Sequence, residues 1–183
     1  RRNIIINGGM QIAQRGTSAT NVGSTTSGFH TLDRFKHFSD GGSAGRLTMS
    51  QSTVSDLPGF ANALKLDCTT ADTSIAASEY FILSHPIEGQ DLQQLKKGTS
   101  SAEKITLSFY VKGNASATYS VELNDGSRRI GQTFSVTTSW NRVVLTFDGD
   151  TSGAIDDDNT VGLYVNFWLH AGSTFSGSTH GTS

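Results

Sequence analysis

Residues 103–112 read Glu103-Lys104-Ile105-Thr106-Leu107-Ser108-Phe109-Tyr110-Val111-Lys112, with apolar and polar side chains alternating from Ile105 onward. A period of two places the apolar residues on one face of an extended segment and the polar residues on the other. The stretch therefore predicts a half-buried β-strand. Residues 119–124, 140–147 and 161–169 repeat the pattern, and a sheet built from such strands needs a second layer to cover its apolar face.

The rest of the chain adds shorter elements. We predict further strands over residues 4–6, 46–51, 63–68 and 79–84, the last of them ending at His85-Pro86 or lying at a sheet edge. Residues 17–28 are rich in Ser, Thr, Gly and Asn and predict a surface loop, whereas residues 29–38 have a partly helical spacing. Residues 90–98 predict a two-turn helix with Leu92 and Leu95 on one side. The sequence thus predicts an all-β, two-sheet antiparallel β-sandwich of the jelly-roll type with one short helix.

Composition limits the organisation and the partners of the chain. The 183 residues fit one domain, 1–183. Charged residues make up 16% and the formal net charge is -2, so we do not expect nucleic-acid binding. No apolar run approaches the length of a membrane span, so we do not expect insertion into a membrane. Cys68 continues the apolar side of its alternation and is expected to be buried. The polar tail over residues 172–183 is expected to be a loop or a connection to a longer protein of which this chain is a fragment.

The last predicted strand carries the candidate binding residues. If Leu163, Val165, Phe167 and Leu169 face inward, then Tyr164, Asn166 and Trp168 face outward, and Tyr110 extends the same kind of surface on the central strand. Aromatic rings beside amides suit sugars, because the C–H face of a sugar stacks on the ring while its hydroxyls need polar partners. The alternative is that these aromatic residues pack under a loop, a helix or a neighbouring subunit.

Acidic residues near the C-terminal end are the candidate metal ligands. Asp156, Asp157 and Asp158, together with Asp148 and Asp150, could hold Ca²⁺ through hard oxygen ligands. The alternative is a solvated turn, since the spacing matches no EF-hand. No other cofactor is predicted. The sequence contains no catalytic motif, Glu103 and Glu122 are expected at exposed strand positions, and we do not expect an enzyme.

Several phrases, in an order that covers nearly the full chain, resemble a domain of tail-fibre and other virion proteins of tailed bacteriophages. They lie at residues 3–16, 31–35, 87–91, 105–112, 139–140 and 162–167. The resemblance implies a jelly roll similar to carbohydrate-binding modules, located on the exterior of a virion in a tail fibre or capsid appendage. It also implies other virion proteins as partners, a homo-oligomer such as a trimer, and contact with a bacterial surface glycan.

Two functions therefore remain open. The first is a bacteriophage virion structural protein that also binds a host-surface glycan. The second is a purely structural capsid or tail module for decoration or oligomerisation, without ligand binding. The surroundings of Tyr110, Tyr164 and Trp168 distinguish the two, because an open surface favours binding and a subunit contact favours assembly.

Overall fold

The computed structural model describes residues 3–40 and 42–176, which cluster into two compact units. Unit 1 holds residues 3–85 and 168–176, and unit 2 holds residues 86–167. Two long strands, β6 (Tyr80–Glu88) and β11 (Val161–Ala171), contribute residues to both units.

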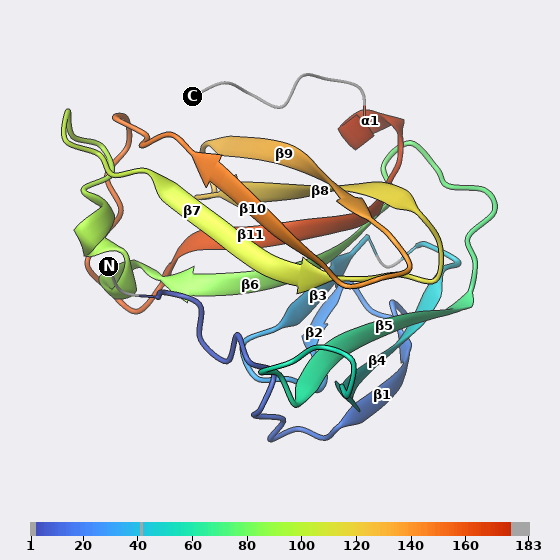
Figure 1. Ribbon diagram of the computed structural model, residues 1–183. Helices are drawn as coiled ribbons and strands as arrows, with labels where there is room; N and C mark the ends of the chain where they lie inside the picture. The colour runs from blue at the N-terminus through green and yellow to red at the C-terminus, as the bar shows by residue number, and fades with distance from the viewer. Residues whose placement is uncertain (1–2, 41, 177–183) are drawn as a thin grey trace. The chain divides into compact units, whose positions relative to one another are not determined.

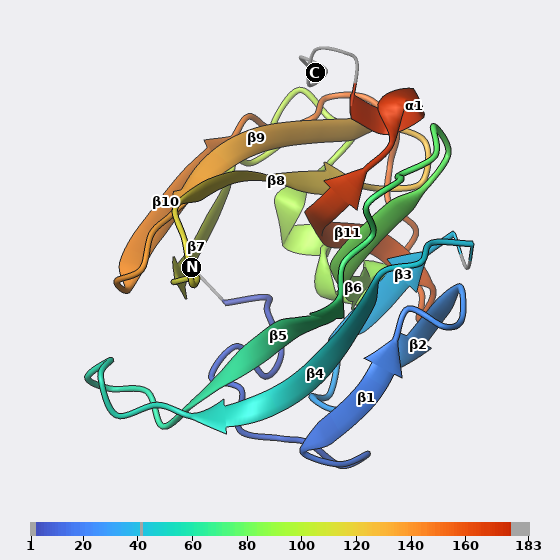
Figure 2. The same ribbon diagram turned by 90° about the vertical axis from the view of Figure 1, so that its right-hand side faces the viewer.

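Unit 1 is built from two sets of antiparallel strands. The first set has the order β1-β4-β5 and is visible as three adjacent ribbons in Figure 2. In the second set β2 pairs with β3, and β3 pairs with β6. The bounds of the strands not yet given are β1 (Ser18–Val22), β2 (Ser27–Phe29), β3 (Lys36–Ser39), β4 (Arg46–Thr53) and β5 (Asn62–Thr70).

The core of unit 1 contains aromatic rings and histidines. His37 and Ser39 of β3 are buried, whereas Lys36 and Phe38 on its other face are partly exposed. The His37 ring lies 5.5 Å from the Phe81 ring, and Phe81 lies 6.1 Å from His170. The alternation in β3 therefore separates a buried face from a surface face within four residues.

Unit 2 is also built from two antiparallel sets. One set pairs β7 (Ile105–Val111) with β10 (Asn141–Phe147), which run side by side in Figure 1. The other set has the order β11-β8-β9, with β8 (Ala117–Asn124) and β9 (Arg129–Val136) paired along their full lengths.

The two sets of unit 2 meet through three phenylalanines. The centre of the Phe109 ring of β7 lies 5.1 Å from the centre of the Phe134 ring of β9 and 5.1 Å from that of the Phe167 ring of β11, in edge-to-face geometry. Leu107, Val121 and Leu163 are buried in the same interior. The alternation predicted for residues 105–112 is confirmed, because Thr106, Ser108 and Tyr110 of β7 are exposed. The fold is the predicted all-β antiparallel sandwich of the jelly-roll type, and its short helix is α1 (Ser173–Ser176).

The helix predicted over residues 90–98 is not an α-helix. The segment forms two 3₁₀ turns, η1 (Gly89–Asp91) and η2 (Gln93–Leu95), and Lys96 ends the second with a left-handed φ of 49°. An isolated segment of this length cannot repay the cost of nucleating an α-helix. Leu92, between the two turns, is 1% exposed and anchors them.

Two predictions for the first forty residues are wrong, because residues 17–28 contain β1 and β2 rather than a loop and residues 4–6 form no strand. Residues 36–39, at the end of the segment with partly helical spacing, form β3. Ser- and Thr-rich segments can form strands here because the paired strands supply the backbone hydrogen bonds. The isoleucine segment is instead followed by a turn at Asn7, whose side-chain oxygen accepts hydrogen bonds from the backbone N–H groups of Gln11 and Ile12.

Two predictions for the middle of the chain also fail. Strand β6 continues through Pro86 to Glu88, and β6 lies between β3 and β11 rather than at an edge. Cys68 is an exposed free thiol rather than a buried one. It lies on β5, at the edge of its three-stranded sheet, where the register with β4 shifts between Arg46 and Leu47 and interrupts the simple alternation.

In the described part of the chain, no helix has the length and apolar character needed to span a membrane.

Phe109 is expected to be the most sensitive position of β7. Phe109→Ala removes the ring that joins the two layers of unit 2 and should lower the free energy of unfolding by about 2–4 kcal/mol, since the ring is half-buried. Tyr110→Ala, one residue further on the exposed face, should cost less than about 1 kcal/mol. Urea denaturation of both variants checks this. Equal costs would contradict the packing described here.

Three histidines of unit 1 should make the protein sensitive to mild acid. Burial lowers the pKa of His30, His37 and His85, and for His30 the neighbouring His37 lowers it further. A histidine whose pKa is lowered in the folded state contributes stability that is complete above its unfolded value of about 6.5 and is lost as pH falls from there through the folded pKa. We expect the thermal midpoint to fall between pH 7.5 and pH 5, and to fall less in His30→Gln. A midpoint that is constant over this range would contradict the expectation.

Candidate functional site

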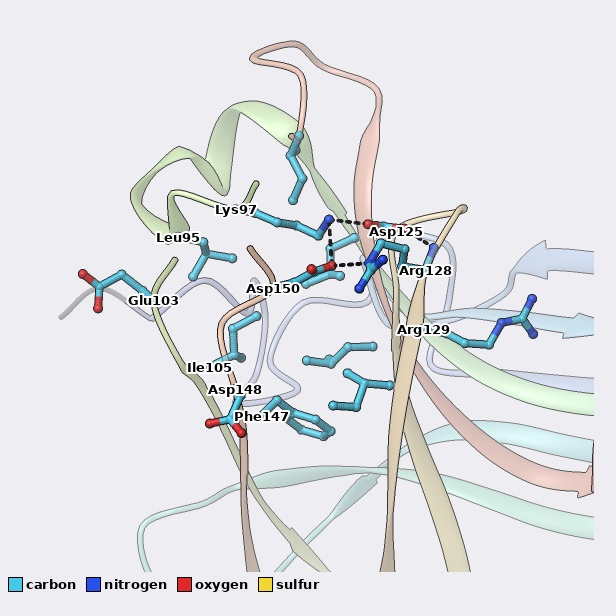
Figure 3. Close-up of a pocket in the computed structure, with 14 residues that line it drawn as sticks. Leu95, Lys97, Glu103, Ile105, Asp125, Arg128, Arg129, Phe147, Asp148 and Asp150 are labelled. Atoms are coloured by element: carbon cyan, nitrogen blue, oxygen red, sulfur yellow. Dashed lines mark hydrogen bonds and ion pairs between the residues drawn. The ribbon is translucent and has the colours of Figure 1, made fainter. Parts of the chain in front are cut away.

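A cavity of about 260 Å³ opens inside unit 2, where β7 and β9 begin and β8 and β10 end. Its wall is apolar and its rim is charged (Figure 3). The apolar residues are Leu95, Ile105, Leu123, Ile130, Phe147, Ile155 and Leu163, and the charged ones are Lys97, Glu103, Asp125, Arg128, Arg129, Asp148 and Asp150. The ends of four strands meet here, and Leu123, Phe147 and Leu163 of the cavity wall belong to the buried core.

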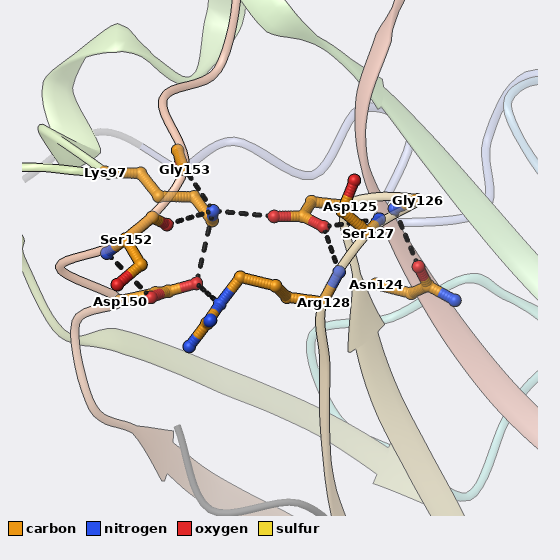
Figure 4. Close-up of polar contacts among 9 residues, drawn as sticks. All are labelled: Lys97, Asn124, Asp125, Gly126, Ser127, Arg128, Asp150, Ser152 and Gly153. Atoms are coloured by element: carbon orange, nitrogen blue, oxygen red, sulfur yellow. Dashed lines mark hydrogen bonds and ion pairs between the residues drawn. The ribbon is translucent and has the colours of Figure 1, made fainter.

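The side chain of Lys97 is the centre of the rim (Figure 4). Its Nζ atom lies 2.6 Å from Asp125 Oδ2 and 3.2 Å from Asp150 Oδ2, and it donates hydrogen bonds to the carbonyl oxygens of Ser152 (2.9 Å) and Gly153 (2.6 Å). Arg128 Nε donates to the same Asp150 oxygen at 2.8 Å. The Lys97 and Asp125 side chains are only 12% and 10% exposed, so this pair is largely buried, whereas Arg128 at the outer end of the network is 43% exposed.

The network lowers the pKa of both aspartates. Burial acts to raise the pKa of Asp125, but the hydrogen bonds from Lys97 and from the backbone N–H groups of Arg128 and Ser127 outweigh it. For Asp150, burial is likewise opposed by the backbone N–H of Ser152, by Lys97 and by Arg128. Both carboxylates are thus held in the charged form. Their contribution to stability is present above the unfolded pKa and is lost only as pH falls through the lowered folded values.

The sequence 124–128 places Asp125 and Arg128 by forming a tight turn between β8 and β9. Asn124 Oδ1 accepts a hydrogen bond from the Gly126 N–H at 2.8 Å, and Asp125 Oδ1 accepts from the Ser127 and Arg128 N–H groups at 2.9 and 2.6 Å. Gly126 has a φ of +92°, a conformation that side-chain-bearing residues rarely adopt. The turn therefore fixes one carboxylate and one guanidinium on the same rim.

Gly98 brings Lys97 to the loop that follows β10. The Gly98 N–H donates to the Asp150 carbonyl at 2.9 Å. A Cβ atom on Gly98 would lie 2.8 Å from the Ala154 nitrogen, and its φ of +81° also favours glycine. The backbone approach that Gly98 permits allows Lys97 to reach both aspartates.

The sequence does not predict Lys97, Asp125 and Arg128 as site residues. The available signal was the pair of turns at 124–126 and 148–150, each with an aspartate beside a glycine after a strand. Whether these two turns come into contact depends on which strand ends lie side by side in the fold. Each carboxylate of the network is paired with a cation. The cavity therefore presents an apolar surface to a ligand, and the charges of the network are already neutralised.

The predicted glycan residues lie on different surfaces. Tyr110 follows Phe109 on β7, and Asn166 precedes Phe167 on β11. Because Phe109 and Phe167 pack against each other across the interior of unit 2, their neighbours in sequence point away from each other. Tyr110 is therefore on the outer face of β7 and β10, while Tyr164 and Asn166 are on the outer face of the β11-β8-β9 set. Trp168 belongs to unit 1, where its ring lies 6.3 Å from Tyr80 and 5.7 Å from Phe175.

Asn166 is buried beside a carboxylate. Its Nδ2 atom donates to Glu122 Oε1 at 3.2 Å, and Asn124 Nδ2 donates to the same oxygen at 3.0 Å. Glu122 is itself buried, so its expected exposure is wrong. The reason is that β8 lies between β11 and β9, and amide donors from its own strand and from β11 satisfy the carboxylate. Tyr164 on the same strand is half-buried.

The outer face of β7 and β10, which we call the platform, is the most open of the predicted binding surfaces. The cross-strand pairs are Thr106 with Thr146, Ser108 with Val144, and Tyr110 with Arg142, and all six side chains are exposed. Tyr110 is 41% exposed. At the end of the platform, Lys112 Nζ lies 5.0 Å from the centre of the Trp140 ring.

The predicted calcium residues do not converge. Asp158 Oδ1 accepts hydrogen bonds from the backbone N–H and the hydroxyl of Thr160, at 2.9 and 2.7 Å. The backbone carbonyls of Asp156 and Asp158 accept from Gln93 Nε2 and the Gln90 N–H. Over residues 3–40 and 42–176, no three His, Cys, Asp or Glu side chains form a group that could hold a metal ion. Calcium binding by Asp156, Asp157 and Asp158 stays a prediction.

Lys97 is expected to stabilise unit 2 strongly. Lys97→Met leaves Asp125 and Asp150 facing each other without their shared cation and should lower the free energy of unfolding by about 2–4 kcal/mol. The control is Lys104→Met, which breaks a largely exposed ion pair with Asp148 (2.7 Å) and should cost less than about 1 kcal/mol. Chemical denaturation of both variants at neutral pH tests this difference. A Lys97 variant as stable as the Lys104 variant would show that the network contributes little.

Comparisons with known proteins leave the chain without an assigned family. No protein-family model matches it, and no curated protein matches it. A solved structure titled "CBM4 structure and function" is similar to it, with 17% sequence identity and a TM-score of 0.48, covering 90% of this chain and 88% of that chain. The resemblance to bacteriophage tail-fibre and other virion proteins stays a prediction. A structural likeness of this degree assigns neither a family nor a ligand to the chain.

Proposed function

We propose that the protein is a non-catalytic glycan-binding module and that the platform of unit 2 is its binding surface. The observation that carries the proposal is the exposure of Tyr110, whose ring stands among hydroxyl and cationic side chains on a two-stranded face. A sugar can stack its C–H face on such a ring while its hydroxyls bond to neighbouring polar groups. The hydroxyls of Ser108 and Thr106 and the guanidinium of Arg142 lie on the same face as Tyr110.

The platform suits a chain of sugars better than a single one. Tyr110, Ser108 and Thr106 succeed each other on one face of β7, so polar contacts repeat along the strand at about 7 Å. Trp140 and Lys112 extend the surface beyond Tyr110. An open face of this kind gives few contacts per sugar, and affinity gains when several copies act together.

The proposed setting is the exterior of a bacteriophage virion, in a tail fibre or capsid appendage, and the ligand there is a host-surface glycan. The support for this setting is the sequence resemblance alone. In it, other virion proteins are the partners and a homo-oligomer supplies the several copies.

A purely structural module is the second candidate function. Val144 favours it, because this apolar side chain is 53% exposed in the middle of the platform. On this reading, the platform packs against another chain of the same appendage, and Tyr110 is part of that contact.

Binding to an array of bacterial surface polysaccharides tests the proposal, with Tyr110→Ala and Tyr164→Ala beside the wild type. These two tyrosines lie on opposite outer faces of unit 2, so each serves as the control for the other. We expect Tyr110→Ala to weaken binding about tenfold, the loss of one stacking contact, and Tyr164→Ala to leave it unchanged. Circular dichroism confirms that both variants fold.

The opposite pattern would contradict the proposed surface. Loss of binding in Tyr164→Ala alone would move the site to the β11-β8-β9 face. Absence of binding by the wild type, together with an oligomer that dissociates in Val144→Asp when its mass is measured by light scattering, would support the structural module instead.

A further inference from the structure

We propose a second binding site, in unit 1, for a polysaccharide that carries carboxylate groups. It consists of Arg15, Phe29, Lys36 and Phe38, which we call the cationic patch. The patch shares no residue with the platform of unit 2, so the inference does not depend on the proposed function.

The pairing of β2 with β3 assembles the patch. Phe29 is directly opposite Lys36, and Ser27 is opposite Phe38. Lys36 and Phe38 occupy the partly exposed face of β3, whereas His37 and Ser39 occupy the buried face. In the described part of the chain β2 is the end strand of its sheet, with β3 as its single neighbouring strand, so no further strand pairs with β2 beside Phe29.

Two cations surround the exposed ring of Phe29. The Arg15 guanidinium carbon lies 5.4 Å from the centre of this ring, and Lys36 Nζ lies 5.5 Å from it. Lys36 Nζ is also 4.4 Å from the centre of the Phe38 ring. Phe29 is 37% exposed, so an apolar surface and two positive charges are presented together.

Neither cation has a carboxylate partner in the described part of the chain. The contacts of Lys36 are with the two rings, and the contact of Arg15 is with Phe29. The carboxylate of Asp33, in the same unit, accepts a hydrogen bond from the Gln14 N–H at 3.0 Å. Other cations of the protein are paired: Lys65 with Asp67, Lys96 with Glu103 and Lys104 with Asp148.

This combination selects an acidic sugar. The C–H groups of a sugar can contact the exposed part of the Phe29 ring, and a carboxylate on that sugar can pair with Arg15 or with Lys36, which both lie over the ring. The net charge of the chain is -2, so a polyanion is not attracted by the protein as a whole, and binding must come from a local site. Two cations beside a single exposed ring also fall short of the many phosphate contacts on which nucleic-acid binding depends.

Calorimetric titration of the full chain with an oligogalacturonate tests the proposal, with the methyl-esterified oligomer as the matched neutral ligand. We expect the acid to bind and the ester not to bind. We also expect affinity for the acid to fall about tenfold in Lys36→Gln and in Arg15→Gln, since each loses one charge-assisted contact. Lys65→Gln removes a cation of the same unit that is already paired and should leave the affinity within about twofold.

Other results would overturn the proposal. These are no binding of the acid by the wild type, equal binding of acid and ester, or equal loss in Lys65→Gln. A single-stranded oligonucleotide that binds equally well and is lost in the same variants would show a general polyanion surface instead. If Tyr110→Ala abolishes uronate binding while Lys36→Gln does not, the cationic patch is excluded and the platform is the site. Thermal unfolding of each variant confirms that it is folded.

Discussion

The edge-to-face packing of Phe109 against Phe134 and Phe167 is the contact on which unit 2 depends. It joins the β7–β10 pair to the β11-β8-β9 set, and neither set could otherwise cover its apolar face. Because strands alternate, fixing one residue of β7 inward fixes its neighbours outward. Tyr110 and the rest of the platform are exposed for the same reason that Phe109 faces the interior.

The same constraint separates residues that the sequence groups together. The sequence predicts that Tyr110, Tyr164 and Asn166 each face outward. The outward faces of the two layers of a sandwich point in opposite directions. The interior between them is filled by phenylalanines. Under the proposed function, a single glycan on unit 2 would use one of these surfaces, and the openness of the platform, compared with the half-buried Tyr164 and the buried Asn166, favours Tyr110.

Charges in this protein are arranged in two contrasting ways. At the rim of the cavity in unit 2, Lys97 and Arg128 neutralise Asp125 and Asp150. These ion pairs join the three loops that carry the four residues. In unit 1, Arg15 and Lys36 lie against aromatic rings without carboxylate partners in the described residues. The first arrangement stabilises the fold. The second leaves positive charge available to a ligand, which is the basis for treating it as a site.

The sequence by itself determined the strands that bury one face. The alternation at Ile105–Val111 is sufficient, because a period of two has a single structural meaning in a segment of this length. It could not determine β1 and β2, whose Ser- and Thr-rich segments become strands only through the hydrogen bonds of paired strands. It also could not determine the burial of Glu122, which depends on donors from Asn124 and from Asn166, 44 residues away. Tertiary structure alone decided which charges meet: Lys97, Asp125 and Asp150 lie far apart in the chain, and the ends of different strands bring them within hydrogen-bonding distance.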